Sequence, residues 1–155
     1  MYEYNFEKLE VWKFSIDFAK KIYEITESFP DIEKFGLVSQ IRRAVVFVSS
    51  NLAEGSAKQS LKDQARFTEM AFGSLMEILN QIILSFKLKF IKENDYIDIR
   101  DYIENLSRQL NALKKIMLAV TENKKEIVLK APTGSGKTII LTHFMDEYIK
   151  GHSKT

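Results

Sequence analysis

The chain of 155 residues is 45% hydrophobic and 28% charged, which is typical of one globular domain, or one small domain with an appendage, and excludes a disordered chain. It has no Cys and two His, which excludes disulfides, a cysteine nucleophile and a histidine-rich metal site. The net charge of +2 divides into −1 over residues 1–122 and +3 over residues 123–155, so the larger part lacks the basic character of a nucleic-acid-binding protein.

The first predicted element is a helix over residues 6–29, and the scarcity of Gly and Pro favours helix throughout the chain. Its expected buried face recurs at spacings of three and four and consists of Leu9, Trp12, Ile16, Ala19, Tyr23 and Thr26, extended by Phe6 and Phe29. The expected solvent face consists of Lys13, Asp17, Lys20, Glu24 and Glu27. Pro30 ends this helix, and Asp31 is expected to cap the next one.

The second predicted helix covers residues 32–54. Its apolar stripe is Leu37, Ile41, Ala44, Val45, Val48 and Leu52. The β-branched run at residues 45–48 resembles a strand, but the stripe continues at helical spacing on both sides and no turn signal bounds the run. We therefore expect helix there, with Gly55 as its natural end.

The third predicted helix runs from about residue 61 to 90, with Ser60 and Asp63 forming a capping box at its start. Its expected buried face is Phe67, Met70, Ala71, Ser74, Leu75, Ile78, Ile82, Ser85 and Leu88. The small residues at positions 71, 73 and 74 are expected to allow close approach of a neighbouring helix.

The fourth predicted helix covers about residues 95–122 and starts at Asn94 or Asp95. Its stripe is Ile99, Ile103, Leu106, Leu110, Leu113, Met117 and Val120. Four amphipathic helices with short connections predict an all-α fold, an antiparallel up-down four-helix bundle over residues 1–122.

A different pattern begins at residue 123. Residues 126–130 indicate a short strand and residues 138–150 a helix, and between them Ala131 and Pro132 are followed by Thr133, Gly134, Ser135, Gly136, Lys137 and Thr138. This order fits the P-loop, with Ala131 at the first glycine position. The glycines turn backbone N–H groups toward a phosphate, Lys137 would neutralise the β- and γ-phosphates, and Thr138 would ligate Mg²⁺. We expect residues 123–155 to be a separate strand–P-loop–helix segment.

Within residues 126–150 this alanine variant resembles the first motif of superfamily 2 helicases and the related restriction-enzyme motor subunits. Such motors also need an acidic second motif and an arginine finger, which do not follow in this sequence. A single strand also lacks the parallel neighbours that bury it in a motor domain. We interpret the segment as the stub of a truncated or fused motor gene; the alternative is a working appendage that binds Mg-ATP. Hydrolysis by this chain is not expected.

Ordered motifs along residues 5–120 carry a second resemblance. They are Phe6-x-x-Leu9-x-Val11-Trp12, Ile22-Tyr23-x-x-Thr26-x-x-Phe29-Pro30, Glu33-x-Phe35-Gly36-Leu37-x-x-Gln40-Ile41-Arg42-Arg43-Ala44, Ser50-Asn51-Leu52-Ala53-Glu54-Gly55 and Ala71-x-Gly73-Ser74-Leu75-x-Glu77. In this set the chain resembles the four-helix bundle proteins encoded by intervening sequences within bacterial 23S rRNA genes. Phe47 departs from the pattern, because the family more often has a small polar residue there.

The resemblance implies a compact antiparallel bundle and a homo-oligomer, with pentamers known among relatives. It also implies a link to RNA or DNA, since one related group serves reverse transcriptases of retroelements and binds nucleic acid through a basic surface. The charge of −1 over residues 1–122 weakens that link here.

The candidate site residues of the bundle are polar residues within these motifs: Arg42, Arg43, Asn51, Glu54 and Glu77. The two arginines can contact phosphate, or they can pair with Glu54, Glu77 or Asp17, and we favour pairing. Asn51 and Glu54 can form a site, or they can satisfy backbone groups at the helix end, which we favour. Gly73 and Ser74 are expected to make a close helix contact.

No carboxylate pair, no Ser/His/Asp set and no Glu-x-x-His pattern occurs in residues 1–122, so we predict a protein that is not an enzyme and needs no metal or cofactor. The predicted function is self-assembly, with RNA or DNA as a further partner and no membrane. The alternative is an ATP-binding protein in which the bundle is an oligomerisation or regulatory module. The absence of Cys and of an apolar signal segment predicts the reducing cytoplasm.

Overall fold

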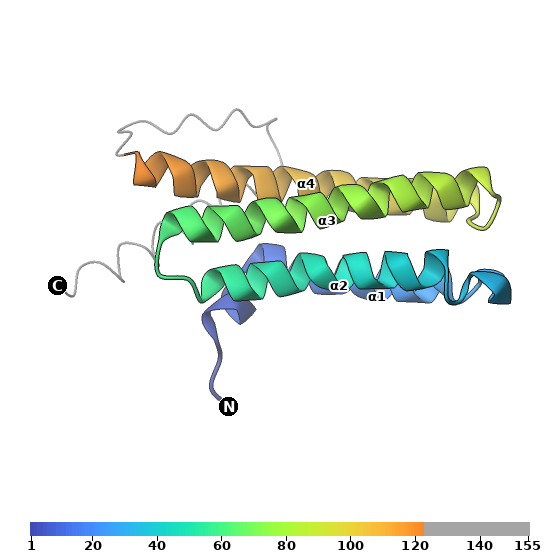
Figure 1. Cartoon of the computed structure of the whole chain (residues 1–155), viewed down its shortest axis with the longest axis horizontal. Coiled ribbons are helices and arrows are strands. Elements are labelled where there is room, and N and C mark those ends of the chain that lie inside the picture. Colours follow the sequence, from blue (N-terminus) through green and yellow to red (C-terminus); the bar gives the residue numbers. More distant parts are fainter. Residues whose placement is uncertain (123–155) are drawn as a thin grey trace. The chain divides into compact units, whose positions relative to one another are not determined.

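The apolar periodicity of the sequence produces four long helices in the computed structural model, which describes residues 1–122 (Figure 1). They are α1 (Glu10–Thr26), α2 (Leu37–Ser56), α3 (Leu61–Lys87) and α4 (Glu93–Thr121). Two short 3-10 helices, η1 (Asn5–Lys8) and η2 (Asp31–Glu33), precede α1 and α2. The part of the chain that the structure describes has no strand, so the all-α prediction is confirmed there. The predicted strand, P-loop and final helix lie outside these residues.

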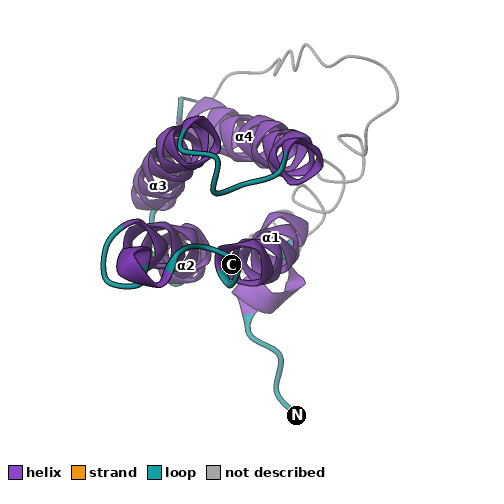
Figure 2. Ribbon diagram, turned by 90° about the vertical axis from the view of Figure 1, so that its right-hand side faces the viewer, coloured by secondary structure: helices purple, strands orange, loops and turns teal. Residues whose placement is uncertain are grey.

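Consecutive helices run antiparallel and surround one core. Viewed along the bundle, α1 lies beside α2 and α4, and α3 lies beside α2 and α4 (Figure 2). Short connections join each helix to the next, as the up-down prediction requires. None of these helices is long and apolar enough to cross a membrane.

The predicted core faces of α2 and α4 are confirmed. Every residue of the predicted α2 stripe is buried, and the run at residues 45–48 is helical. In α4 the stripe is buried from Ile99 to Met117, whereas Val120 is half-buried and Ile116 joins the core. Each of these helices has one dominant apolar stripe, so its spacing determines which side packs inward.

The predicted core face of the first helix is correct at Thr26 and Phe29 and is displaced by about one residue over the rest of α1. The buried residues of this helix are Val11, Ser15, Phe18, Ile22, Ile25 and Thr26. Trp12, Ile16 and Ala19 are half-buried at the edge of the core, and Tyr23 is exposed. Apolar residues occupy two adjacent stripes of α1, and both stripes have helical spacing. Packing against α2 and α4 selects the stripe that contains Phe18 and Ile22, and the five predicted solvent-facing residues are exposed.

The predicted core face of α3 is correct in its centre and wrong at its margins. Ala71, Leu75, Ile78, Ile82 and Ser85 are buried as predicted. The prediction omitted three further buried residues, Ala65, Thr68 and Gln81. Two residues assigned to the core, Met70 and Leu88, are exposed, and Phe67 and Ser74 are half-buried.

The helix ends are formed by side chains near those predicted. The Ser60 hydroxyl accepts a hydrogen bond from the Asp63 N–H at 3.1 Å, which confirms the predicted cap of α3. Asp31 lies in η2 instead of capping α2, and the Glu33 carboxylate accepts from the Leu37 N–H at 3.1 Å. The N-cap of α4 is Lys92, two residues before Asn94 and three before Asp95, the two expected starts, and its side chain makes no capping bond.

Gly55 lies in the last turn of α2, one residue before its end, at the place where α2 and α3 approach closely. A Cβ at this position would lie 2.8 Å from the Cβ of Phe67. These two helices therefore approach closely at Gly55, whereas Gly73, one of the small residues of α3 that the sequence indicated, has no neighbour within 4 Å of an added Cβ.

Candidate functional site

Four of the five candidate polar residues lie on α2, and the helix turns them in different directions. Arg43, Asn51 and Glu54 are separated by whole helical turns, so they share one side with Phe47. Arg42 lies one residue away and points toward α1, where it bonds. Glu77 is the only candidate on α3.

Arg42 fastens the end of α1 to α2. Its Nε donates to the Thr26 Oγ1 at 2.8 Å, and its Nη2 donates to the Tyr23 carbonyl at 3.2 Å. The guanidinium also lies over the Tyr23 ring, 4.6 Å from its centroid. The Tyr23 carbonyl belongs to the last turn of α1, where it also accepts from the Thr26 Oγ1 at 3.1 Å, so Arg42 supplies a second partner from α2. The geometry gives Arg42 a structural role.

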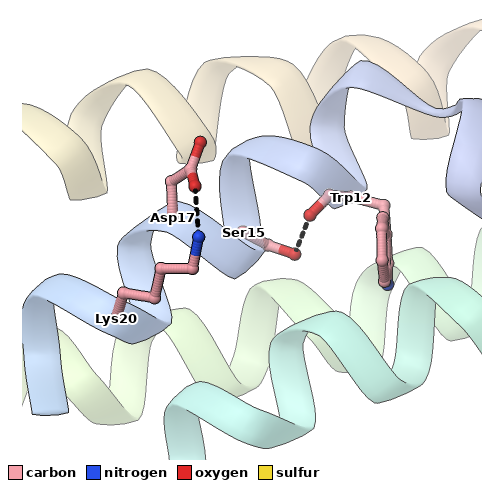
Figure 3. A network of polar contacts seen from close by, with 4 residues as sticks. All are labelled: Trp12, Ser15, Asp17 and Lys20. Atoms are coloured by element: carbon pink, nitrogen blue, oxygen red, sulfur yellow. Dashed lines mark hydrogen bonds and ion pairs between the residues drawn. The ribbon is translucent and has the colours of Figure 1, made fainter.

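The acids predicted to pair with Arg42 or Arg43 bind other residues, so the pairing prediction is wrong. Asp17 lies 3.5 Å from Lys20 on the exposed side of α1 (Figure 3). The same view shows a separate contact, in which the buried Ser15 hydroxyl donates to the Trp12 carbonyl. Glu54 pairs with Lys58 at 3.3 Å. Each partner lies three or four residues away in the chain, Lys58 just after the end of α2, and such a neighbour is reached without bending the side chain across the bundle.

Glu77 contacts an amide instead of an arginine. The Gln81 Nε2 donates to the Glu77 Oε1 at 3.2 Å and lies 3.5 Å from the Gln40 Oε1 across the seam between α2 and α3. Gln81 is buried and its Oε1 has no hydrogen-bond partner in the described residues. This polar contact shows that Gln40 of α2 lies opposite Gln81 of α3, which defines the register of the two helices.

Arg43, Phe47 and Asn51 form a column on the exposed side of α2. The Arg43 guanidinium lies 5.2 Å from the Phe47 ring centroid and takes part in no ion pair within residues 1–122. The Asn51 Nδ2 donates to the Phe47 carbonyl at 2.7 Å. Asn51 therefore bonds a backbone group, as we favoured, but inside α2 and not at its end.

Gly73 is exposed, and a Cβ added there would meet no atom within 4 Å. The predicted close helix contact at Gly73 is therefore absent from residues 1–122. Met70 and Glu77 lie on the same side of α3, at spacings of three and four. Gln40 faces Gln81, and Gly55 faces Phe67, so the antiparallel register sets Phe47 across from the turn of α3 that contains Gly73.

We call this surface the outer face; it consists of Arg43, Phe47 and Asn51 on α2 and Met70, Gly73 and Glu77 on α3. Phe47 is 43% exposed and Met70 is 47% exposed. The sequence contained a signal for the exposed Phe47, because a helix cannot direct four consecutive apolar residues into one core. Two of residues 45–48 must point outward, and the structure exposes Val46 and Phe47.

The described residues offer no group of three or more His, Asp or Glu that could hold a metal ion. On the surface of α1 the Lys13 Nζ donates to the Glu10 Oε1 at 2.8 Å, and this hydrogen bond raises the pKa of Lys13 above its usual value of 10.5. The six nucleotide-loop candidates, residues 133–138, lie outside the described residues.

The comparisons with known proteins find two families, which match overlapping parts of the chain. The family described as 23S rRNA-intervening sequence protein matches residues 7–112, which span α1 to most of α4. The family described as type III restriction enzyme, res subunit, matches residues 102–155. No curated protein matches the chain.

Proposed function

The chain belongs to the 23S rRNA-intervening sequence protein family, and from this premise we propose that it is a non-catalytic bundle that assembles with copies of itself through the outer face. The homo-oligomer that the family resemblance implies needs a surface through which copies form a ring or a dimer. The outer face provides apolar side chains, a glycine (Gly73) against which another helix can pack closely, and charges of both signs.

Gly73 is the observation that carries the proposal. A glycine within a helix of 27 residues costs about 1 kcal/mol relative to alanine, and no neighbour in the described residues is so close that a side chain at position 73 would clash with it. A backbone of another copy that packs against this position would clash with any side chain, because only glycine leaves that space open. The cost is then offset in the assembly and not in the single bundle.

The neighbours of Gly73 support the same conclusion. Phe47 and Met70 would leave water on assembly, and each contributes apolar area of the kind found in the centre of protein interfaces. Arg43 and Glu77 have opposite charges, and neither takes part in an ion pair within the described bundle. Across an interface they can pair with their counterparts on the next copy.

The test substitutes Gly73→Leu and measures mass by sedimentation velocity. We expect the wild-type chain to sediment as an oligomer and the variant as a monomer, because the leucine side chain would occupy the space of the approaching copy. The matched control is Asn111→Leu, which adds the same side chain at an exposed position of α4. An oligomer of unchanged mass in Gly73→Leu, with helix content retained, would overturn the proposal.

Binding of structured RNA or DNA is a second candidate function, supported by the Arg43 guanidinium, which has no ion-pair partner in residues 1–122. An oligomer would repeat this cation around its axis. Fluorescence anisotropy with a labelled RNA hairpin should show affinity that falls steeply with salt and weakens in Arg43→Ala. Affinity that is unchanged in Arg43→Ala would exclude this site.

Binding of Mg-ATP is the remaining alternative, supported by the match of residues 102–155 to the restriction-enzyme res subunit. Calorimetry on the full chain and on Lys137→Ala decides it. Heat of binding that is present in the wild type and lost in Lys137→Ala would show a working P-loop. If neither protein binds, the loop is a remnant and function belongs to the bundle.

A further inference from the structure

Two of the three helix connections meet at one end of the bundle, which we call the turn end. Residues 27–36 join α1 to α2, residues 88–92 join α3 to α4, and both connections lie at the end that faces the viewer in Figure 2. The Phe29 and Phe90 rings hold the two connections together, with centroids 5.8 Å apart.

The turn end exposes large apolar side chains. Ile32 is 87% exposed and Phe35 is 90% exposed, and both belong to the α1–α2 connection. Leu88, which follows α3, is 48% exposed. The other described connection, between α2 and α3, has none of the exposed large apolar residues. A cluster of this kind on a small surface indicates a site of contact with another molecule.

The two connections of the turn end have opposite charges. The α1–α2 connection contains Glu27, Asp31 and Glu33 against one lysine, Lys34. Residues 87–92 contain three lysines and no acid, Lys87, Lys89 and Lys92, and two acids, Glu93 and Asp95, follow them in the first turn of α4. None of these charges takes part in an ion pair within residues 1–122. An acidic half and a basic half therefore lie side by side, and their charges remain available.

Hydrogen bonds hold both halves in place before any partner arrives. In the α3–α4 connection the Phe90 N–H donates to the Ser85 carbonyl at 2.9 Å and the Lys89 N–H to the Phe86 carbonyl at 3.0 Å, with Lys89 in the left-handed region at φ 62°. In the α1–α2 connection the Glu33 carboxylate caps α2. A surface ordered in this way loses little conformational entropy on binding.

We propose that the turn ends of two copies bind each other about a two-fold axis. An axis parallel to the boundary between the acidic and basic halves sets each acidic half over the partner copy's basic half. Ile32 and Phe35 of one copy then face Leu88 of the other, and every contact occurs twice. The complementarity lies within one sequence, which commits the occupant to a second copy of this chain.

The contact is weak for single bundles and stronger for assemblies. Packed helices lie about 8–10 Å apart, so a turn end spans roughly 20 Å and offers each copy roughly 400 Å², below the ~800 Å² per partner of a standard interface. Where several bundles are joined through the outer face, several turn ends engage at once and the avidity rises. This strengthening rests on the proposed function; the pairing of two turn ends does not.

The test exchanges the charges of each half separately. One variant, Glu27→Lys with Asp31→Lys, makes both halves basic, and Glu33 is kept because it caps α2. The other, Lys87→Glu with Lys89→Glu, makes both halves acidic. Both are made in the full chain with Gly73→Leu, and sedimentation velocity at about 50 mM salt follows monomer and dimer, since low salt preserves surface electrostatics.

We expect each variant alone to dimerise about tenfold more weakly than its parent, because like charges then face each other. An equimolar mixture of the two should regain the dimer as a heterodimer, since both of its contacts join opposite charges. Circular dichroism confirms that each variant is folded. A mixture that dimerises no better than the separate variants would overturn the proposal.

Two further results show which molecule binds the turn end. Phe35→Ser should weaken the dimer at high salt as well as low, because its contribution is apolar. If Phe35→Ser instead removes binding to anionic phosphatidylserine vesicles and leaves the dimer intact, the turn end binds lipid and the proposal is wrong. If Gly73→Leu fails to dissociate the oligomer formed through the outer face, only the proposed function fails. Pairing of turn ends is then measured as a doubling of that oligomer's mass.

Discussion

Gly55 and Gly73 lie in the adjacent helices α2 and α3, and they differ in how closely their neighbours in the described bundle approach them. At Gly55 an added Cβ would meet the Cβ of Phe67 at 2.8 Å, whereas at Gly73 it would meet nothing within 4 Å. The first glycine is explained by the bundle itself, because α2 and α3 pack through it. The second has no such neighbour within residues 1–122, and the proposed contact with another copy would account for it. A small residue in a helix therefore has to be judged by what surrounds it before a role is assigned.

The largest expected effect comes from removing the space at Gly55. In Gly55→Ala the new methyl group meets a Cβ that cannot rotate away, so α3 must shift and the core around Leu52 must repack. We expect the free energy of unfolding to fall by about 2 kcal/mol. Urea denaturation followed by circular dichroism measures it. A fall below about 0.5 kcal/mol would show that the approach at Gly55 is readily relaxed, and the contrast with Gly73 would be lost.

Arg42 provides the next test, because it joins α1 to α2 at a helix end and not through the core. Arg42→Met keeps the apolar stem but removes the bonds to Thr26 and to the Tyr23 carbonyl. We expect a loss of about 1.5 kcal/mol.

The matched control for Arg42→Met is Arg43→Met, on the same turn of α2. Arg43 is exposed and makes no bond to α1, so a change under about 0.5 kcal/mol is expected. Equal losses in the two variants would contradict the structural role of Arg42.

Gly73→Ala should have the opposite sign from Gly55→Ala. In protein dilute enough for the proposed oligomer to dissociate, alanine favours the helix and meets no neighbour within residues 1–122, so stability should increase by about 1 kcal/mol. At high protein concentration the same methyl group should weaken self-association. An increase in stability without any loss of association would contradict the assembly role of Gly73.

The smallest expected effect is at Lys89, which adopts a left-handed backbone that glycine adopts without strain. Lys89→Gly should raise the free energy of unfolding by about 0.5 kcal/mol, because the relieved strain exceeds the added entropy of the unfolded chain. Thermal unfolding in dilute protein checks it. A destabilised variant would show that the Lys89 side chain contributes to the bundle.

The sequence was sufficient for the fold class and for two of the four core faces. In α2 and α4 one apolar stripe dominates, so spacing alone identified the buried residues. In α1 the stripes containing Trp12 and Phe18 have the same period, and only packing against neighbouring helices distinguishes them. The helix ends show the same limit, since Glu33 caps α2 from a connection whose path the sequence does not specify.

The candidate site was less predictable than the fold. Arg42 binds a carbonyl and a hydroxyl, and the acids assigned to it bind residues three or four positions away in the chain. Charge alone does not reveal such a choice, because surface ion pairs are weak and a helix-end carbonyl competes with them. The exposure of Phe47 was accessible from the length of its apolar run, whereas the open space at Gly73 required the positions of the neighbouring helices.

The buried polar residues of the bundle have a consequence for its response to acid. They are Ser15, Thr26, Ser49, Thr68, Gln81 and Ser85. None of them has a side chain that gains or loses a proton in water at ordinary pH. Protons taken up or released when this bundle unfolds must therefore be exchanged at its surface, so its interior provides no trigger by which a change of acidity could open it.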